Sequence, residues 1–463
     1  YDESAIYKMF HKENFIKYLP QEKKRLYRLV LKSLESYHSS IDSELKNFLH
    51  QIEILYEKGL YSQCAKILSK AKKIAYRYEK YESLIEILIW ERNIIAIHPQ
   101  GGNIQQKKHA IYNEKQGVLK KLHNVDEYVN LSDKIHSFRL TKGVSRSEYE
   151  LQEFKNLMHH TLLKEESEAL TKESKRIFYF IYASFYEQTG DLVKSYDYHK
   201  KIVALIESST EQIKARPSIY VMALSNFARI SYQLARYDEL SLIIKQMRTI
   251  PEQLGSKCAE SIKVKVFAQS YDLELDMYIT TCRFEKAAYL ISSIEKGMEQ
   301  FKGKMDRQHE IVFYGNFACL YFIQCEYKKA LSWNNKILND IDANIREDIY
   351  CSARIFNLII HYELDNEGLL EYLEKPTHRY LDKRQKLYKV ETSILDFIRK
   401  KLPKAISQKE LMGAFKELKI EIEEITNDPF EKQALEYFDF ISWIESKIEN
   451  RPFAEIVRSR HRT

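Results

Sequence analysis

The chain has 463 residues, of which 44% are hydrophobic and 30% are charged, a balance typical of a folded protein rather than a disordered one. It contains 12 glycines and 8 prolines, too few turn residues for a large β-sheet protein, so long helices are expected. The 73 basic and 66 acidic residues give a net charge of +7, which permits contact with an acidic partner without requiring one.

None of the 6 cysteines forms a C-x-x-C pair, so we expect free thiols in a reducing compartment and a cytoplasmic location. The sequence has neither an apolar run of about eighteen residues nor a signal peptide, and we therefore expect no membrane partner. The first residue is Tyr1 rather than methionine, from which we expect that an upstream segment has been removed.

Three short helices are expected near the N-terminus, over residues 3–10, 13–18 and 21–38. The third is basic, with five cations at Lys23, Lys24, Arg25, Arg28 and Lys32. Residues 1–41 are expected either to cap the rest of the chain or to end a truncated domain. Together with an upstream segment they would make a helix-turn-helix domain, which binds DNA.

One pattern then recurs along the chain: a tight turn followed by apolar or small residues at offsets of +2, +5, +9 and +12. The offsets +5, +9 and +12 predict the inward face of a helix, with a small residue at +5 where the two helices approach closely. The offset +2 predicts a side chain that fills the corner of a helical hairpin. The five clearest turns lie at Gly59, Gly190, Ala235, Cys282 and Cys325. Weaker copies are expected to turn near Asn124 and Asn366.

These hairpins resemble the tetratricopeptide repeat superfamily. The small residue in the first helix of that family is matched by Ala183, Ala228 and Ala318, and its turn and second-helix pattern by Gly190, Tyr237, Phe284, Tyr327, Ala287, Ala330 and Ala71. The resemblance covers residues 42–375 and implies an all-α fold, a right-handed superhelix of antiparallel helix pairs with atypical helical caps. The whole chain also resembles a group of uncharacterised bacterial proteins of this repeat type, which implies no function.

The repeats are longer than those of the family. Successive turns at Gly190, Ala235, Cys282, Cys325 and Asn366 are 45, 47, 43 and 41 residues apart, whereas the family repeat is about 34 residues. A break at His98–Asn103, with one proline and two glycines, and a soft link near Gly143 divide the array. We therefore expect an N-terminal cap over 1–41, helical pairs over 42–141, a main array over 142–375 and capping helices over 376–463. The last two capping helices are expected over residues 406–425 and 427–448.

The strongest candidate binding residues are polar and lie on the first helices of the repeats. Nine residues before three of the turns stand Asn226, Asn316 and Asn357, while two other copies carry Ile181 and Leu273. The resemblance places this position in the concave groove of the array, where an asparagine offers a donor and an acceptor to an extended peptide. Arg229 and Tyr232 follow Asn226 on the same helical face. The alternative interpretation is that these asparagines merely line a wet inner surface or form hydrogen bonds between helices.

A second candidate surface is a basic stripe that runs down the helix after Gly59. Lys66, Lys70, Lys73, Arg77 and Lys80 recur at spacings of 4, 3, 4 and 3 residues. Such a stripe neutralises phosphates in nucleic-acid-binding proteins, but it is more often the solvated face of an amphipathic helix. The alternative function is therefore a bacterial regulator with an N-terminal nucleic-acid-binding segment and a peptide-sensing array.

No enzyme motif for nucleotides, metals or nucleophilic catalysis occurs in the sequence. The doublet His159-His160, with Glu165 and Glu166, is the only local cluster that suggests a metal, but consecutive helical residues point about 100° apart. We expect no enzyme, no cofactor and no metal. The sequence instead favours a non-enzymatic scaffold that binds a protein or peptide in the concave groove.

Overall fold

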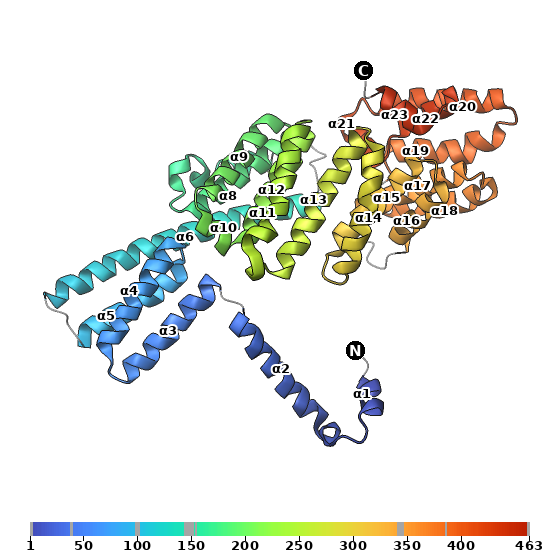
Figure 1. The fold of residues 1–463 in the computed structure, drawn as a ribbon. Coiled ribbons are helices and arrows are strands. Elements are labelled where there is room, and N and C mark those ends of the chain that lie inside the picture. The colour runs from blue at the N-terminus through green and yellow to red at the C-terminus, as the bar shows by residue number, and fades with distance from the viewer. Residues whose placement is uncertain are drawn as a thin grey trace. The chain divides into compact units, whose positions relative to one another are not determined.

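The computed structural model describes residues 3–37, 40–97, 102–142, 152, 155–339, 347–384 and 387–460 (Figure 1). Every regular element among these residues is a helix, and the helices pack in consecutive neighbouring pairs, which confirms the predicted all-α repeat fold. The described residues fall into two compact units. One lies within 1–141, 152–184 and 204–217, and the other within 185–203 and 218–463.

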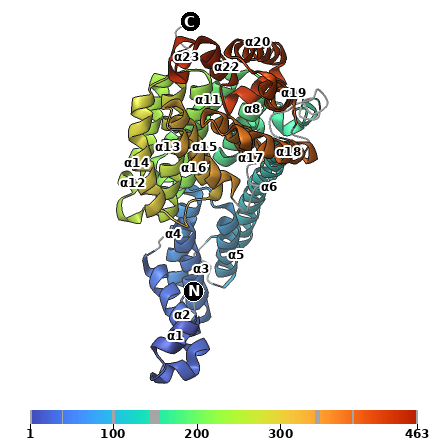
Figure 2. The same cartoon turned by 90° about the vertical axis from the view of Figure 1, so that its right-hand side faces the viewer.

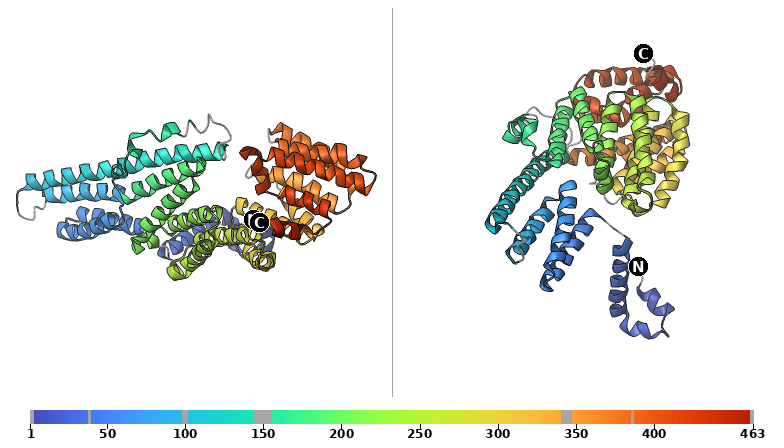
Figure 3. Two further views of the ribbon diagram at one scale, coloured as in Figure 1. Left: turned by 90° about the horizontal axis from the view of Figure 1, so that it is seen from above. Right: turned by 60° about the vertical axis from the view of Figure 1, so that its left-hand side comes forward.

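The first unit contains a stack of helices in its N-terminal part. Its elements are α1 (Glu3–Met9), a 3-10 helix (Asn14–Tyr18), α2 (Leu19–Tyr37), α3 (Ile41–Glu57), α4 (Tyr61–Arg77), α5 (Tyr81–Ile97) and α6 (Ile104–Lys142). Figure 3 shows α3, α4 and α5 as successive antiparallel helices beside the longer α6. Leu45, Cys64 and Leu84 from the three helices share one apolar core with Val118 of α6.

The N-terminal helices lie where the sequence predicted them, but their side chains are mostly exposed. Of the side chains described between residues 3 and 34, only Leu19 is buried. The middle segment forms a 3-10 helix of five residues rather than an α-helix. The described residues 3–37 therefore do not by themselves form the packed three-helix core that a helix-turn-helix domain requires.

The second unit consists mainly of helical hairpins (Figure 2). Its pairs are α11 (Pro217–Gln233) with α12 (Tyr237–Leu254), α13 (Glu260–Thr280) with α14 (Phe284–Gln300), α15 (Arg307–Ile323) with α16 (Tyr327–Leu338), and α17 (Glu347–Glu363) with α18 (Glu367–Lys383). Preceding them in the chain, α8 (Lys172–Gln188) and α9 (Leu192–Glu207) contribute residues to both units. The predicted hairpins are thus present.

The hairpins turn through a residue in the left-handed conformation. The φ angle is 53° at Ala235, 55° at Cys282 and 59° at Cys325, and the predicted turn glycines Gly59 and Gly190 also have positive φ. After Ala235, Cys282 and Cys325, the next amide donates to the carbonyl five residues before it over 2.8 Å. This 6→1 bond is the mark of a Schellman turn and satisfies a carbonyl at the end of the first helix.

Two turns differ from the sequence prediction. The last hairpin turns at Asp365, with φ of 55°, rather than at Asn366, and the Asn366 amide donates to the His361 carbonyl over 3.0 Å. A further turn of the same kind occurs at Glu79, between α4 and α5, where the sequence offered no glycine. Because a left-handed residue need not be glycine, these turns are hard to place from sequence.

The predicted inward positions are buried in all five clear copies. Residues at offsets +5, +9 and +12 have exposed fractions between 0 and 5%. They are Cys64, Leu68, Ala71, Ser195, His199, Ile202, Leu240, Ile244, Met247, Ala287, Ile291, Ile294, Ala330, Asn334 and Ile337. The turn therefore sets which face of each second helix enters the core.

The turn predicted near Asn124 is wrong, because α6 runs without interruption from Ile104 to Lys142. Asn124 lies in the middle of this helix and is 7% exposed. Its side-chain amide donates to the Glu168 carbonyl, and its side-chain oxygen accepts from the Leu170 amide, each over 3.0 Å. The polar side chain that suggested a turn instead fixes residues 168–170 against the helix.

The C-terminal prediction is half right. The first closing helix is confirmed as α20 (Gln408–Ile425), which starts with a capping box between Ser407 and Glu410. The predicted second helix is broken into α21 (Pro429–Lys432), a 3-10 turn and α22 (Phe440–Glu449), followed by α23 (Phe453–Arg460). The break has a local cause, because the Asp439 side chain accepts from the Ser442 amide over 2.9 Å and starts a new helix.

Among the described residues, no helix combines the length and apolar character needed to cross a membrane. The 6 cysteines are all free.

The turn geometry predicts that Ala235→Gly stabilises the protein. Glycine relieves the left-handed strain at this position, and we expect a gain of about 0.5–1 kcal/mol. Ala204→Gly, at an exposed position inside α9, is the matched control and should cost about 1 kcal/mol. Urea unfolding followed by circular dichroism measures both. Equal losses for the two variants would contradict the turn assignment.

The Asn124 contacts predict a second effect. Asn124→Ala leaves the Glu168 carbonyl and the Leu170 amide without their partner and should cost about 2–3 kcal/mol. Hydrogen exchange at the Leu170 amide should accelerate to the extent that corresponds to the same loss of free energy. Asn130→Ala, at an exposed position of the same helix, should change neither quantity appreciably. An unchanged exchange rate at Leu170 in Asn124→Ala would show that this clamp is absent.

Candidate functional site

Four polar residues lie together on the first helices of three successive hairpins, and we call them the inner polar row: Asn226, Arg229, Asp276 and Asn316. Asn226 and Arg229 belong to α11, Asp276 to α13 and Asn316 to α15. The Asn316 side-chain amide donates to the Asp276 carboxyl over 2.8 Å. Arg229 lies near enough to Asp276 to act on its charge. The row therefore crosses three repeats in the second unit.

The row is regular because the turns are regular. Asn226 and Asn316 each stand nine residues before a turn residue, while Arg229 and Asp276 each stand six residues before one. Arg229 is exposed, and the other three side chains are half-buried. Equivalent backbone positions thus place alternating amide and charged groups on one face.

Asp276 has an unusual protonation equilibrium. Burial and the nearby Asp272 carboxylate together raise the pKa of its carboxyl to about 8, although Arg229 and Asn316 act in the opposite direction. The carboxyl is therefore largely protonated at neutral pH. In that state it does not neutralise Arg229, whose charge remains available at the surface of the row.

The structure places the other predicted groove residues differently. The Tyr232 hydroxyl is hydrogen-bonded to Thr280 over 2.6 Å, so this tyrosine ties α11 to the end of α13. Asn357 is only 8% exposed, in the interior of the α17 hairpin rather than on an open surface. Counted from the observed turn at Asp365, the position that matches Asn226 and Asn316 is Phe356, which is also buried, so the row does not continue into α17.

Four cations of the predicted basic stripe lie on α4 and the fifth, Lys80, follows its end, but two of the five are engaged. Lys80 forms an ion pair with Asp42 over 2.6 Å, and Arg77 forms one with Glu211. Lys70 lies over the ring of Phe48, with 4.7 Å from its ammonium nitrogen to the ring centroid. Lys66 and Lys73 are exposed, as are Lys70 and Arg77. The stripe is thus a weaker phosphate-binding surface than its sequence implied.

The histidine doublet is part of the local backbone structure. The His160 ring accepts from the Leu162 amide over 3.3 Å at the start of a 3-10 turn, and Glu166 pairs with Lys175 over 2.6 Å. No group of three or more potential metal ligands occurs in the part of the chain that the structure describes.

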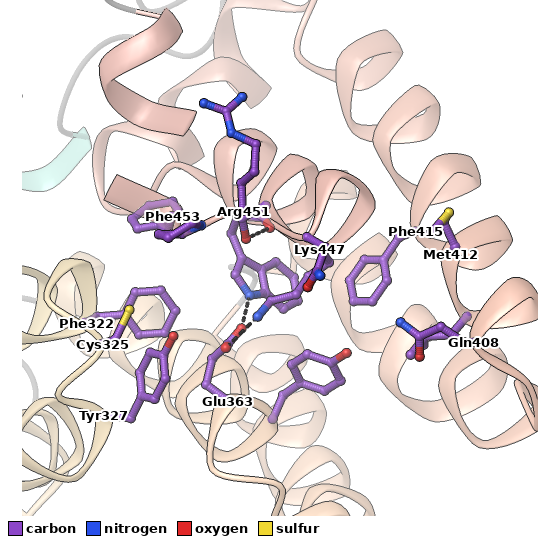
Figure 4. A pocket seen from close by; sticks show the side chains of 16 residues that line it. Phe322, Cys325, Tyr327, Glu363, Gln408, Met412, Phe415, Lys447, Arg451 and Phe453 are labelled. Atoms are coloured by element: carbon purple, nitrogen blue, oxygen red, sulfur yellow. Dashed lines mark hydrogen bonds and ion pairs between the residues drawn. The ribbon is translucent and has the colours of Figure 1, made fainter. Parts of the chain in front are cut away.

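A pocket of about 360 Å³ opens in the second unit between the hairpin that turns at Cys325 and the C-terminal helices (Figure 4). The residues that line it include the rings of Phe322, Phe415 and Phe453, which are 0 to 6% exposed, and polar side chains such as Gln408 and Asn450. The Trp443 ring, 1% exposed, packs edge-on against Phe415 with ring centroids 5.7 Å apart. The wall of the pocket is therefore rigid and close to the core.

One buried carboxylate organises the floor of the pocket. The Glu363 side chain, 6% exposed, accepts from the Trp443 indole nitrogen over 2.7 Å and from the Lys447 ammonium over 2.5 Å. Trp443 and Lys447 lie four residues apart on one face of α22 and reach the same acid. Burial and the Glu363 charge raise the pKa of Tyr362 to about 12 and also raise that of Tyr327, so both phenols stay protonated.

Asp276 and the pocket were not predicted from the sequence. Asp276 had a visible signal, because it occupies the same offset from its turn as Arg229. The pocket had none, since it joins Glu363 at the end of α17 to residues about 80 positions later in α22. Comparison with known proteins adds no further assignment: neither a scan of protein-family models nor a search of curated proteins finds a match to this chain.

The raised pKa of Asp276 predicts a pH-dependent stability. The folded state holds a proton that the unfolded carboxyl loses near pH 4, so the stability that this group contributes falls as the pH rises from 4 towards 8. Asp276→Asn keeps an acceptor for Asn316 and removes the charge. Its stability relative to the wild type should therefore be greater at pH 8 than at pH 5, by about 1.4 kcal/mol or more.

Urea unfolding at the two pH values measures this difference. Asp382→Asn, at an exposed position in the last turn of α18, is the control. It should change the free energy of unfolding by the same amount at both pH values. If the difference between Asp276→Asn and the wild type does not change with pH, Asp276 is not protonated in the folded protein.

Proposed function

We propose that this chain is a non-enzymatic scaffold that binds a peptide or an extended protein segment along the inner polar row. The observation that supports this proposal is the continuity of the row across α11, α13 and α15, with one exposed cation and amide groups at matched offsets. An extended peptide repeats its backbone groups at a fixed interval, so a surface with repeated polar groups suits it.

Preorganisation supports the same proposal. Asn316 is held by Asp276, and each first helix is fixed by the turn that follows it, so little side-chain entropy would be lost on binding. Arg229 is exposed in the row, and its guanidinium favours a ligand with a carboxylate or an exposed carbonyl near that position. We also propose the tetratricopeptide relationship and a cytoplasmic location, which the free cysteines support.

Nucleic-acid contact remains the alternative, and it rests on the exposed Lys66, Lys70 and Lys73 of α4. Binding to random duplex DNA that weakens steeply with salt would favour it. No binding at low salt would remove it.

The proposal predicts that a peptide ligand depends on Arg229 and Asn226. Twelve-residue random peptides displayed on phage and selected on the full chain provide the probe, and the affinities of the selected synthetic peptides are measured by calorimetry. The double variant Asn226→Ala with Arg229→Ala should bind them about tenfold more weakly or worse, because a charge-assisted contact and an amide contact are lost.

The matched control is Asn339→Ala with Arg379→Ala, two exposed residues outside the row. This control should bind as the wild type does. The proposal is overturned if selection yields no binder, or if every selected peptide binds both double variants equally.

A further inference from the structure

One face of α13 is polar over about four helical turns. Its residues recur at spacings of 4, 3, 4 and 4 and lie within about 80° of one another around the helix. They are Lys265, Gln269, Asp272, Asp276 and Thr280. The inner polar row uses only one of these five side chains, so most of this polar face has no assigned role.

The contacts at the two ends of the face show where it points. Lys265 donates to the Ser218 hydroxyl of α11 over 3.2 Å, and the Thr280 hydroxyl is hydrogen-bonded to Tyr232 of the same helix over 2.6 Å. The helices α12 and α14 contact the other side of α13. The polar face therefore lies on the same side as the inner polar row.

In the middle of the polar face, two acceptor atoms have no donor among the described residues. They are Oε1 of Gln269, which is closed to solvent, and Oδ2 of Asp276. The other oxygen of Asp276, Oδ1, accepts from the Asn316 amide over 2.8 Å. A desolvated acceptor without a donor destabilises a fold and is uncommon in native proteins. The unused hydrogen-bonding capacity of this face is thus that of an acceptor.

The charges around Asp276 point to a donor that is also a cation. Asp272, 6% exposed, lies one helical turn from Asp276 on the same face. Arg229 acts on Asp276 from a distance, and the two form no ion pair in the described structure. On the α15 side, burial and the charges of Asp439 and Asp276 raise the pKa of the Cys319 thiol to about 12, so this thiol is neutral. Asp276 therefore has an acid beside it and no cation in contact among the described residues.

We propose that the inner polar row binds an arginine side chain of its peptide ligand, with the guanidinium between Asp272 and Asp276. This inference rests on the proposed function, because it names the part of the peptide that the row recognises. Side chains one helical turn apart have Cβ atoms about 5–6 Å apart, so a planar guanidinium with N–H groups on two edges can donate to both carboxylates. A lysine ammonium is a point charge and fits this arrangement less well.

The same geometry assigns places to the neighbouring groups. Gln269 lies one turn before Asp272 and accepts a further N–H of the ligand through its Oε1 atom. Arg229, which is exposed, meets a carbonyl of the peptide backbone beside the bound arginine. The ligand thus presents a basic side chain to α13 and an acceptor to α11.

Binding of this kind releases a proton. Asp276 is largely protonated at neutral pH because its pKa is raised to about 8, whereas a carboxyl in contact with a guanidinium is ionised. At pH 7 we therefore expect the release of roughly 0.5–1 proton per complex. Binding lowers the pKa of Asp276, so the affinity should increase from pH 6 to pH 8 and then level off.

The peptides selected on the full chain provide the probes, each synthesised in two forms. One form keeps its arginine, and the other carries citrulline, which has nearly the same shape and no charge. Calorimetry at pH 7 in phosphate and in imidazole, two buffers with different ionisation enthalpies, gives the affinity and the proton release. We expect arginine in the selected sequences, binding at least about tenfold weaker for the citrulline form, and proton release only with the arginine form.

Two variants assign the effect to the carboxyl pair. Asp276→Asn keeps the size of the side chain and an acceptor for Asn316, and it should bind the arginine and citrulline forms equally without proton release. Asp272→Asn should reduce the preference for arginine at least severalfold. Asp382→Asn, at an exposed position of α18, is the matched control and should behave as the wild type. Circular dichroism checks that each variant is folded.

The outcomes separate this inference from the proposed function. Selected peptides that depend on Asn226 and Arg229, but lack arginine, tolerate citrulline or release no proton, overturn the inference and leave the proposed function in place. A preference for arginine that survives in Asp276→Asn also overturns the inference, because the guanidinium then binds elsewhere. If selection yields no binder, or only binders indifferent to Asn226 and Arg229, both proposals are overturned.

Discussion

The structure depends on the left-handed residue that closes each helical hairpin. At Ala235, Cys282, Cys325 and Asp365 the chain accepts a backbone conformation that is costly for a residue with a Cβ atom, about 1 kcal/mol or more. In return, the following amide satisfies a carbonyl at the end of the first helix. The reversal is tight, so the second helix must begin two residues later and pack antiparallel to the first.

This constraint fixes the angular register of both helices. Counting forward from the turn gives the buried face of the second helix, where offsets of +5, +9 and +12 are closed to solvent. Counting back gives the inner face of the first helix, where Asn226, Arg229, Asp276 and Asn316 form one row. A turn that moves by one residue rotates a side chain by about 100° around its helix, so Asn357 does not occupy the position of Asn226 and Asn316.

The sequence predicted the parts of the fold that arise from short-range periodicity. The helical class, the five clear turns and the inward positions all follow from spacings within about twenty residues. The prediction failed where a polar residue had a tertiary role: Asn124 suggested a turn but clamps residues 168–170 against a continuous helix. It also failed at the pocket, because Glu363, Trp443 and Lys447 meet only through the packing of α17 against α22.

Of the two candidate binding surfaces, one could be predicted from local sequence spacing and the other could not. The inner polar row follows from repetition, and three of its four residues were predicted from offsets. The pocket follows from the way in which the C-terminal helices end the array, and its chemistry is set by one buried acid that holds two donors in place. The tertiary contacts of the aromatic residues in the capping helices therefore could not be predicted from any local pattern.

The most direct test of the account is native-state hydrogen exchange at the amides that follow the left-handed residues, Arg236, Glu326 and Asn366. The account predicts protection as strong as that inside the preceding helix, because each of these amides donates to a carbonyl five residues earlier over 2.8–3.0 Å. Amides in the exposed first turn of the following helix, such as that of Asp238, should exchange faster. Exchange of Arg236, Glu326 and Asn366 at the rate of an unstructured chain would contradict the proposed turns and, with them, the register of the inner polar row.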